Sequence, residues 1–411
     1  MTKPNGVQLY HSGDLGDVVY AIPALRRLAF PAHLTLYPNP GVTRTIMDEG
    51  NADLILPLLN SQRGVTADWK PNYGATGLRM DFAIRRFYHC GMNLADIHSN
   101  WVGHDHWNTE MPWLIANGVT PHPYKIVVSR SARYRNDSFR WKDLHAQFKR
   151  HACFIGVPWE HADFVNHIGP IDFVETTTLL DVAKVIMGAD LFIGNQSCPR
   201  AIAEGLKVPV IVEHGSPENT HFARECAWYP GHGAVPDISD LVLSSYWARA
   251  ASMRAVGRSV YPQNHLQRLA EACYTVRHLP GHGLEIGVGK GGSAAVIAWC
   301  LQRPLHLVDY LEQSKDAAAF LRVYDFKLST EGFQRFSADP NAPDSLAFVH
   351  IDTGSTTGIG GMVTWADARL VDGGVIVISG VRATDPAIQA LPRKFESIGF
   401  DNLSYYVKQG T

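Results

Sequence analysis

The fold of this chain is decided by Gly-Asp-Leu-Gly-Asp at residues 13–17, which separates a short apolar segment, 7–10, from an amphipathic run, 18–27. This order predicts a strand, a glycine turn and a helix. Glycines permit positive φ and let a ligand approach the backbone, and the free N–H groups of a helix start favour an anionic or polar group. The structural alternative is a helix cap. The candidate ligand-facing residues are Gly13, Asp14, Gly16 and Asp17.

A second unit of strand, loop, helix and strand lies between residues 179 and 212. A helical pattern, 179–186, precedes an apolar strand, 189–194, and a small-residue helix, 201–206, precedes another strand, 208–212. The intervening polar loop stands at the carboxyl end of a parallel strand, where doubly wound α/β folds bind ligands. Its candidate ligand-binding residues are Asn195, Gln196, Ser197, Cys198 and Arg200.

Together, stretches 12–26 and 189–210 resemble the two hallmark segments of the heptosyltransferase family of glycosyltransferases. The resemblance covers about residues 1–235. It implies a GT-B architecture, in which two Rossmann-like domains face each other across a cleft. We therefore expect an N-terminal Rossmann-like acceptor domain over 1–120 and a nucleotide-sugar-binding domain over 121–235.

The same resemblance implies roles for single residues. Asp17 matches the proposed general base of the family, and Glu160 matches the acid that holds the nucleotide ribose. The loop 195–198 matches the one that embraces the donor sugar and diphosphate. Two positions depart from the family pattern: Asn195 stands where an Asp is usual, and Arg200 where a His is usual. Both departures leave the identity of the sugar open.

The segment 125–151 is basic, because it carries eight Lys or Arg against two Asp in a chain of net charge −2. After an expected strand, 126–128, the guanidinium groups of Arg130, Arg133 and Arg135 suit diphosphate oxygens. They would neutralise the charge of a departing diphosphate without a metal. A solvated basic helix face is the alternative.

Composition indicates a soluble globular protein of two or three domains, with 411 residues, 45% of them hydrophobic and 18% charged. The net charge of −2 argues against general attraction to nucleic acid or membranes. We see no secretory leader pattern and no apolar run of about 20 residues, so we expect a cytoplasmic protein. Six cysteines without C-x-x-C spacing indicate reduced thiols.

Histidine is abundant, with 19 residues, and part of it gathers with Trp, Tyr and Asn in segment 87–113. This composition is typical of a polar pocket that stacks against its ligand. Zinc is the alternative, although no His pair at i,i+4 with a Glu supports a metal. We expect His98, Trp101 and His104 on the acceptor side.

A change of composition near residue 228 leads through an expected helical linker, 236–280, into a further domain, 281–411. Segment 283–293 predicts a strand, a glycine loop and a helix, and 306–309 predicts a second strand ending in an acid. The glycine spacing excludes a Walker phosphate-binding loop. A glycine turn followed by a ribose-holding acid remains.

This domain resembles class I S-adenosylmethionine (SAM) methyltransferases, most like the macrocin O-methyltransferase type, in four segments between residues 284 and 380. The resemblance implies that Gly287 and Gly289 pass the carboxyl end of the cofactor and that Asp309 holds its ribose. The candidate SAM-binding residues are Glu285, Gly287, Gly289, Asp309 and Asp352.

The domain also departs from these relatives, which carry a second acid two residues after the one matched by Asp352 and an Asp pair after the strand 375–378. Here Gly354 and the pair Ser379-Gly380 stand instead. We therefore expect no divalent-metal site. A structural, oligomerising or acceptor-docking role is the prediction, with an active methyltransferase as the alternative.

The sequence thus predicts an α/β protein that combines a GT-B glycosyltransferase with a C-terminal Rossmann-like, methyltransferase-type domain. The expected chemistry is the inverting, metal-independent transfer of a sugar from a nucleotide-diphosphate donor to an acceptor hydroxyl, with no cofactor required. A surface glycan, a lipid-linked sugar and a hydroxylated DNA base are open as acceptors, and a homo-oligomer is open too. The alternatives are a bifunctional glycosyltransferase and SAM-dependent methyltransferase, or a noncatalytic sugar-nucleotide- or glycan-binding protein.

Overall fold

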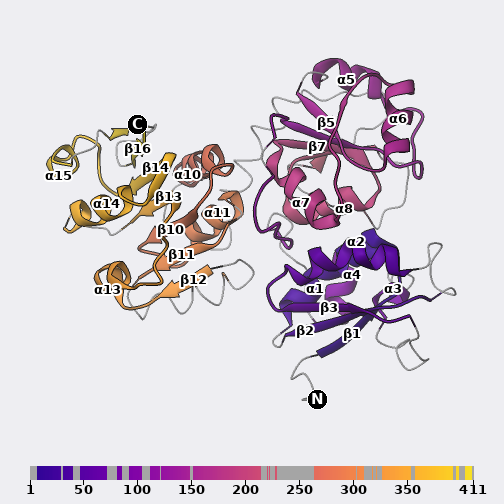
Figure 1. The fold of residues 1–411 in the computed structure, drawn as a ribbon, viewed down its shortest axis with the longest axis horizontal. Coiled ribbons are helices and arrows are strands. Elements are labelled where there is room, and N and C mark those ends of the chain that lie inside the picture. The colour runs from indigo at the N-terminus through magenta and orange to yellow at the C-terminus, as the bar shows by residue number, and fades with distance from the viewer. Residues whose placement is uncertain are drawn as a thin grey trace. The chain divides into compact units, whose positions relative to one another are not determined.

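The chain forms two compact units, Met1–Ser245 and Tyr246–Thr411, shown as a ribbon in Figure 1. The computed structural model describes residues 7–28, 31–39, 47–71, 81–85, 92–103, 112–120, 122–148, 151–213, 220, 222, 227–228, 263–301, 303–309, 317, 321, 326–352, 357–391, 395–397 and 403–409. Within these ranges, no helix has the length and apolarity that crossing a membrane requires.

The N-terminal unit begins with a parallel sheet of order β1-β2-β3. The expected strand, turn and helix are confirmed, because β1 ends at His11 and the helix α1 starts at Leu15. The elements of this part are β1 (Val7–His11), α1 (Leu15–Arg27), β2 (Ala32–Leu36), α2 (Glu49–Asn60), β3 (Val65–Trp69), α3 (Phe82–Arg85) and α4 (Leu94–Trp101).

The second sheet of this unit is entirely parallel and has the order β6-β5-β4-β7-β8-β9. Counted along the chain this is the 3-2-1-4-5-6 order of a doubly wound Rossmann fold. Its elements are β4 (Ile126–Ser129), α5 (Trp141–Phe148), β5 (Ala152–Phe154), α6 (Pro158–His167), β6 (Asp172–Phe173), α7 (Leu179–Gly188), β7 (Leu191–Asn195), α8 (Cys198–Leu206), β8 (Val210–Glu213) and β9 (Ala227–Trp228).

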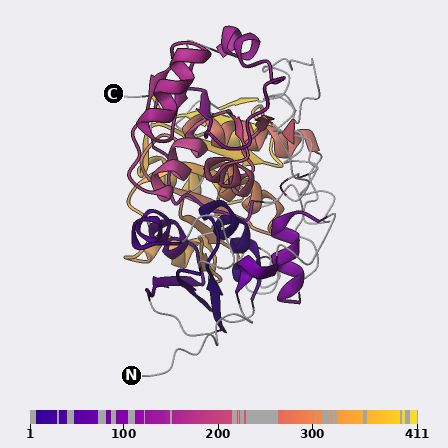
Figure 2. The ribbon, with the colours of Figure 1, turned by 90° about the vertical axis from the view of Figure 1, so that its right-hand side faces the viewer.

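Helices join the two sheets of the N-terminal unit. The sheets occupy opposite halves of the unit in both ribbon views (Figures 1 and 2), and α1 packs on α8 while α2 packs on α7. Every residue of α1 from Val18 to Arg26 is buried, because the helix is covered by the sheet, by α4 and by α8. One apolar core therefore runs through both halves. The Rossmann-like class is confirmed, and a GT-B cleft stays a prediction.

The C-terminal unit is a seven-stranded sheet of order β12-β11-β10-β13-β14-β16-β15, in which only β16 runs antiparallel to its neighbours. Its helix α11 is buried at all ten positions, which fits an apolar helix enclosed between the sheet and α10. The elements are α10 (Gln263–Val276), β10 (His282–Ile286), α11 (Gly292–Leu301), β11 (Leu305–Val308), β12 (Phe326–Ser329), α13 (Gly332–Ala338), β13 (Leu346–Ile351), α14 (Ile359–Asp367), β14 (Leu370–Ser379), α15 (Pro386–Gln389), β15 (Glu396–Ser397) and β16 (Leu403–Val407).

The expected domain boundaries divide the chain more finely than its two compact units do. The limit at residue 120 separates the first sheet from the second, yet both belong to one unit. The described part of the expected linker, 263–280, holds α10, which packs on α11 and β14 and so belongs to the C-terminal unit. Residues 229–262 lie outside the described ranges.

Candidate functional sites

The polar loops of the second sheet meet at its topological switch point. Strands β4 and β7 are neighbours, and the chain leaves them in opposite directions, toward β5 and β8. The loops that follow them therefore lie side by side at the carboxyl edge, which is where doubly wound folds bind ligands. The sequence predicted both loops as parts of one site, and the structure brings them together.

Asn195 shapes the loop after β4. Its amide nitrogen donates to the carbonyl oxygens of Ser131 at 2.9 Å and Arg133 at 2.6 Å, and its oxygen accepts the Ser131 N–H at 3.0 Å. The side chain is fully buried. A carboxylate could not donate to these two carbonyls, which gives a physical reason for Asn where the related family usually has Asp. The structure thus gives Asn195 a loop-holding role in place of the expected donor contact.

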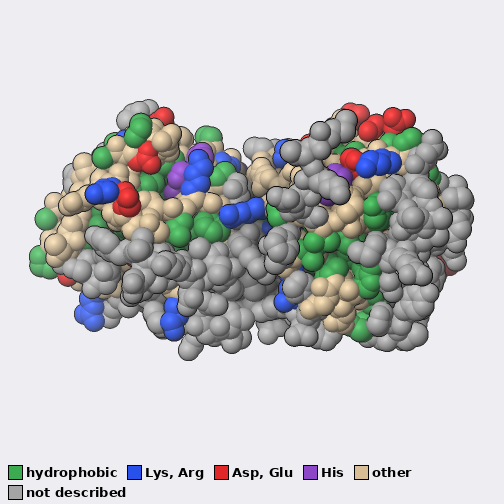
Figure 3. All heavy atoms as spheres, turned by 90° about the horizontal axis from the view of Figure 1, so that it is seen from below, with side chains coloured by type: hydrophobic (Ala, Val, Ile, Leu, Met, Phe, Trp, Pro, Cys, Tyr) green, Lys and Arg blue, Asp and Glu red, His purple; other side chains and the backbone are tan. Residues whose placement is uncertain are grey.

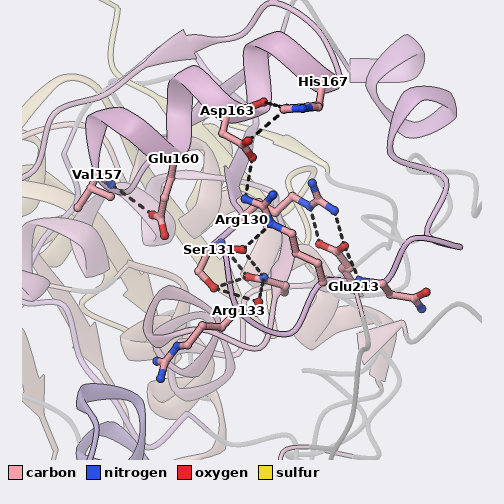
Figure 4. Close-up of polar contacts among 11 residues, drawn as sticks. Arg130, Ser131, Arg133, Val157, Glu160, Asp163, His167 and Glu213 are labelled. Carbon is pink, nitrogen blue, oxygen red and sulfur yellow. Dashed lines mark hydrogen bonds and ion pairs between the residues drawn. The ribbon is translucent and has the colours of Figure 1, made fainter. Parts of the chain in front are cut away.

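Arg130 forms a buried, bidentate ion pair with Glu213 at the end of β8 (Figure 4). Both of its hydrogen bonds to the carboxylate measure 2.8 Å, and the Asn136 N–H adds a third at 2.9 Å. Glu213 is completely enclosed. Arg130 therefore ties the loop to β8, a different role from the expected diphosphate contact. Sequence analysis missed Glu213, although its position directly after the expected strand 208–212 could have indicated it.

The other two predicted arginines differ in their surroundings. Arg135 pairs with Asp163 of α6 at 2.7 Å and donates to the Ser131 carbonyl at 3.2 Å. The Arg133 side chain keeps 53% of its surface exposed and lies 3.7 Å from the carboxylate of Asp14. Among the three arginines of this loop, Arg133 thus presents the most accessible guanidinium to a ligand.

Glu160 faces the same loop from the first turn of α6 (Figure 4). Burial raises the pKa of its carboxyl group, while the N–H groups of Val157 and Ala132 and the charges of Arg135 and Arg133 act in the opposite direction. Glu160 and the arginine loop, which the sequence predicted from separate segments, are therefore neighbours in the structure. The adjacent Trp159, whose side chain is exposed, was not singled out from the sequence.

The Gly-Asp-Leu-Gly-Asp turn reaches the loop after β7. A Cβ on Gly16 would lie 3.7 Å from the Cα of Cys198. Desolvation, followed by the charge of Asp17, raises the pKa of the Cys198 thiol to about 12, so the thiol stays protonated at neutral pH. Together with the contact between Asp14 and Arg133, this places the expected general base beside the expected donor loop.

The remaining residues of the β7 loop point elsewhere. Ser197 stands at the N-cap position of α8, but its hydroxyl donates to the Asn195 carbonyl at 3.3 Å and makes no capping bond. The Gln196 amide donates to Thr220 at 2.6 Å. Arg200 is completely buried, donates to the Tyr20 hydroxyl and stacks on Phe222 at 5.2 Å. Arg200 therefore joins α8 to α1, which departs from its expected place among the donor-binding residues.

A buried carboxylate holds the turn after β1. Asp81 accepts the N–H groups of Ser12 at 3.2 Å and Ala83 at 2.9 Å, and the Tyr37 hydroxyl at 2.6 Å. The Gly13 N–H is bound to His11 at 3.0 Å. Sequence analysis missed Asp81 because it stands alone, outside any pattern, about 65 residues from the turn it supports.

Of the acceptor-side residues predicted in segment 87–113, His98 lies inside the fold. His98 is 1% exposed and packs edge-on against Phe82, as does Trp101, with ring centroids 5.1 and 4.6 Å away. Trp101 keeps part of its surface exposed, and His104 lies outside the described residues. Among the residues that the structure describes, no three His, Cys, Asp or Glu side chains are grouped to hold a metal ion.

The burial of His98 predicts acid sensitivity of the N-terminal unit. Burial, and then the neighbouring His11, lower the pKa of His98 well below 6.5. The folded state therefore binds fewer protons than the unfolded state, and the stability present above pH 6.5 is lost as the pH falls below it, by up to about 1.4 kcal/mol per pH unit. The free energy of unfolding, measured by urea titration at pH 5 to 7.5, should fall less steeply with falling pH in His98→Phe than in the wild type. An equal dependence on pH in both proteins would contradict this assignment.

The glycine loop of the C-terminal unit lies at the switch point between β10 and β13. Gly287 has φ +89°, and a Cβ there would lie 1.7 Å from the carbonyl oxygen of Asp352. Gly289 has φ +52°, and a Cβ there would meet nothing within 4 Å. Gly287 is thus required for packing between strand ends, whereas none of the described residues packs against Gly289.

Asp309 closes this loop. Its carboxylate accepts the N–H groups of Val288 and Gly289, both at 2.9 Å. The predicted glycine turn and acid are therefore in contact. Because a carboxylate already occupies these two amides, a phosphate would meet like charge there. The arrangement suits an uncharged or cationic ligand better than a dinucleotide.

The other predicted positions of this unit divide between core and edge. Glu285 is completely buried, whereas Asp352, directly after β13, is partly exposed. Ser379 is buried at the end of β14, and Gly380 follows with φ +79°. Gly354 lies outside the described residues.

No protein-family model matches this sequence, and neither does any curated protein. The solved structures that resemble this chain over about 40% of its length include SAM-dependent O-methyltransferases. A putative O-methyltransferase from Klebsiella pneumoniae is 17% identical and covers 43% of this chain and 92% of its own, with a TM-score of 0.32. The O-methyltransferase TomG from Streptomyces achromogenes, involved in tomaymycin synthesis and solved with SAM, is 18% identical over 40% of this chain and 90% of its own, with a TM-score of 0.32. An O-methyltransferase from Bacillus cereus, solved with S-adenosylhomocysteine (SAH), is 17% identical over 43% and 94%, with a TM-score of 0.28. Similarity of this size identifies neither a family nor an activity.

Proposed function

We propose that the C-terminal unit binds SAM and that the protein is a transferase that uses it. The observation that supports this proposal is the loop after β10, where no described residue packs against Gly289 and where Asp309 holds the loop amides. Both lie at the switch point of a doubly wound sheet, the usual ligand site of such folds. Sequence analysis predicted sugar transfer as the main activity and included methyl transfer in its alternative.

The residues present fit an adenosyl cofactor. Among the described residues none fills the space at Gly289, so a ligand can approach the backbone there, and the Asp309 carboxylate offers an acceptor for ribose hydroxyls. Asp352 stands at the next strand end and adds negative charge. Bound SAM supplies a methyl group on a sulfonium cation. Because Ser379 and Gly380 stand where relatives carry acids, we expect any methyl transfer to be independent of magnesium.

A pair of glycine substitutions tests the site. Gly289→Ala and Gly358→Ala both place a methyl group on a left-handed backbone, at φ +52° and +82°. The nearest described atom to the new Cβ is Met362 Cε at 3.9 Å for Gly358, and none lies within 4 Å for Gly289. Similar strain is expected in both, but only Gly289→Ala fills the ligand space. We expect calorimetry to show SAM binding at least about 10-fold weaker for Gly289→Ala and unchanged for Gly358→Ala. Only the methyl group added at residue 289 would keep the ligand away from the backbone. Equal affinities would move the site elsewhere.

A second candidate function, sugar transfer by the N-terminal unit, is favoured by the meeting of its two predicted loops. The first turn of α1 lies against Cys198, and Asp14 lies against Arg133. In this proposal Asp17 takes the proton of an acceptor hydroxyl, and Arg133 and Arg135 stabilise a departing nucleoside diphosphate. Glu160 would hold the ribose. If both proposals hold, the chain is bifunctional.

The charges on the described surface bear on the nature of the acceptor. On the face shown in Figure 3, the described Lys and Arg side chains stand singly or in small groups among apolar and polar side chains. The cationic residues of the predicted site are largely paired, since Arg130 and Arg135 each have a carboxylate partner. A glycan hydroxyl or another small acceptor therefore fits the described surface at least as well as a base in DNA.

A further inference from the structure

Four buried side chains of the C-terminal unit form a continuous hydrogen-bonded chain, here termed the relay. Glu285 Oε1 lies 2.9 Å from His350 Nδ1, and His350 Nε2 lies 2.7 Å from Ser379 Oγ. The same hydroxyl lies 2.9 Å from His265 Nε2. The four residues come from β10, β13, β14 and α10, and each is at most 2% exposed.

One arrangement of protons satisfies the whole relay when Glu285 is ionised. The carboxylate can only accept, so His350 donates from Nδ1 and accepts at Nε2 from the Ser379 hydroxyl. The Ser379 oxygen in turn accepts from His265 Nε2–H. Burial lowers the pKa of His265 to about 4, so this ring is neutral at physiological pH. The relay then carries a single negative charge, located on Glu285.

The order Ser379, His350 and Glu285 is that of a nucleophile, a base and an orienting acid. Ser379 is 1% exposed, however, and its hydroxyl contacts both histidines. A substrate carbonyl could not reach it in this fold. The relay is therefore no hydrolytic site, and its role must be sought at the Glu285 end.

Glu285 lies directly beneath the cofactor loop, two residues before Gly287 on β10. Burial raises the pKa of Glu285 above its usual value, and the hydrogen bond from His350 acts in the opposite direction. The Ser293 hydroxyl lowers it further, and Asp352 raises it. His350 is thus the strongest influence that favours the ionised form.

We propose that the relay keeps Glu285 ionised beneath the glycine loop, so that the site favours the sulfonium cation of SAM over the uncharged thioether of the product SAH. This inference rests on the proposed SAM site. At an effective dielectric constant near 20, a buried negative charge favours a nearby cation over an uncharged ligand on the order of 10-fold. His350 acts through Glu285 and is a positioning residue. The relay would help product to leave after methyl transfer.

The test is the ratio of the SAH and SAM dissociation constants, measured by calorimetry on the full chain. Glu285→Gln and His350→Phe should each lower this ratio about 5- to 10-fold, because both remove the negative charge. His350→Gln should keep the ratio, since its amide can donate to Glu285 and accept from Ser379. His306→Gln is the matched control. His306 is a buried histidine of the adjacent strand β11, and its ring bonds His282, which is not part of the relay, at 3.1 Å.

Each outcome decides between explanations. A lower ratio in Glu285→Gln and His350→Phe, with the wild-type ratio in His306→Gln, supports the relay. Loss of SAM and SAH affinity by the same factor would overturn it and leave Glu285 a purely structural residue. Should His350→Phe fail to fold, the comparison of Glu285→Gln with wild type gives the same decision. If wild type binds neither ligand, the proposed SAM site itself is wrong and the inference falls with it.

Discussion

Replacement of Asp17 by Asn is expected to lower kcat for sugar transfer by about 10² to 10⁴, the usual contribution of a general base. Asparagine keeps the size of the side chain but cannot take a proton. The first turn of α1 lies against Cys198, so Asp17 stands beside the donor loop rather than on a remote helix face. Glu160 and Arg135 are untouched by the change, so the affinity for nucleoside diphosphate should stay nearly intact.

Asp48→Asn provides the control for this experiment. Asp48 also stands at the start of a helix in the same unit, where its carboxylate accepts the Asn51 N–H at 2.7 Å. Asparagine is an equally good cap, so neither stability nor turnover should change. If Asp17→Asn keeps more than about a tenth of wild-type turnover, Asp17 is not the base. Its carboxylate would then be a structural feature of the helix start.

The largest effect on stability is expected from Glu213→Ala. This change leaves the Arg130 guanidinium buried without its carboxylate and also removes the acceptor of the Asn136 N–H. Loss of one partner of a buried ion pair destabilises by about 3 to 5 kcal/mol. The free energy of unfolding should be measured by urea titration, with the transition of the N-terminal unit followed separately.

A double replacement distinguishes the buried charge from simple loss of packing. Arg130→Met combined with Glu213→Leu removes both charges and keeps apolar volume, and such replacements are often neutral or stabilising. We expect it to recover most of the stability lost in Glu213→Ala. A double variant as unstable as the single one would show that shape, and not charge, sets the requirement at this position.

The main elements of both units could be predicted because their signals are local. The alternation of apolar runs, glycine turns and polar loops predicted β1, α1 and the loop between β7 and α8, and these are confirmed. The glycine loop after β10 was predicted for the same reason, since its turn is written in consecutive residues.

The roles of single side chains were harder to predict because their partners are remote in sequence. Arg130 and Arg200 have the chemistry of diphosphate ligands, but Glu213 and Tyr20 engage them. Those partners lie 83 and 180 residues away. No local pattern distinguishes an arginine that meets a ligand from one that meets a buried acid.

The relay could not be predicted either. Glu285 and His350 are 65 residues apart, and each stands in a short strand where its residue type carries no signal of its partner. Only the parallel register of β10 with β13, which pairs these two residues, brings the carboxylate to the imidazole. The sheet topology thus brings together two residues whose types and spacing do not indicate a contact.

Calorimetric titration of the intact wild-type protein with SAM is the most direct test of the central claim. The account predicts saturable binding at one site per chain, at least about 10-fold weaker in Gly289→Ala and unchanged in Gly358→Ala. Absence of binding to the folded wild-type protein, or equal binding in all three proteins, would contradict it.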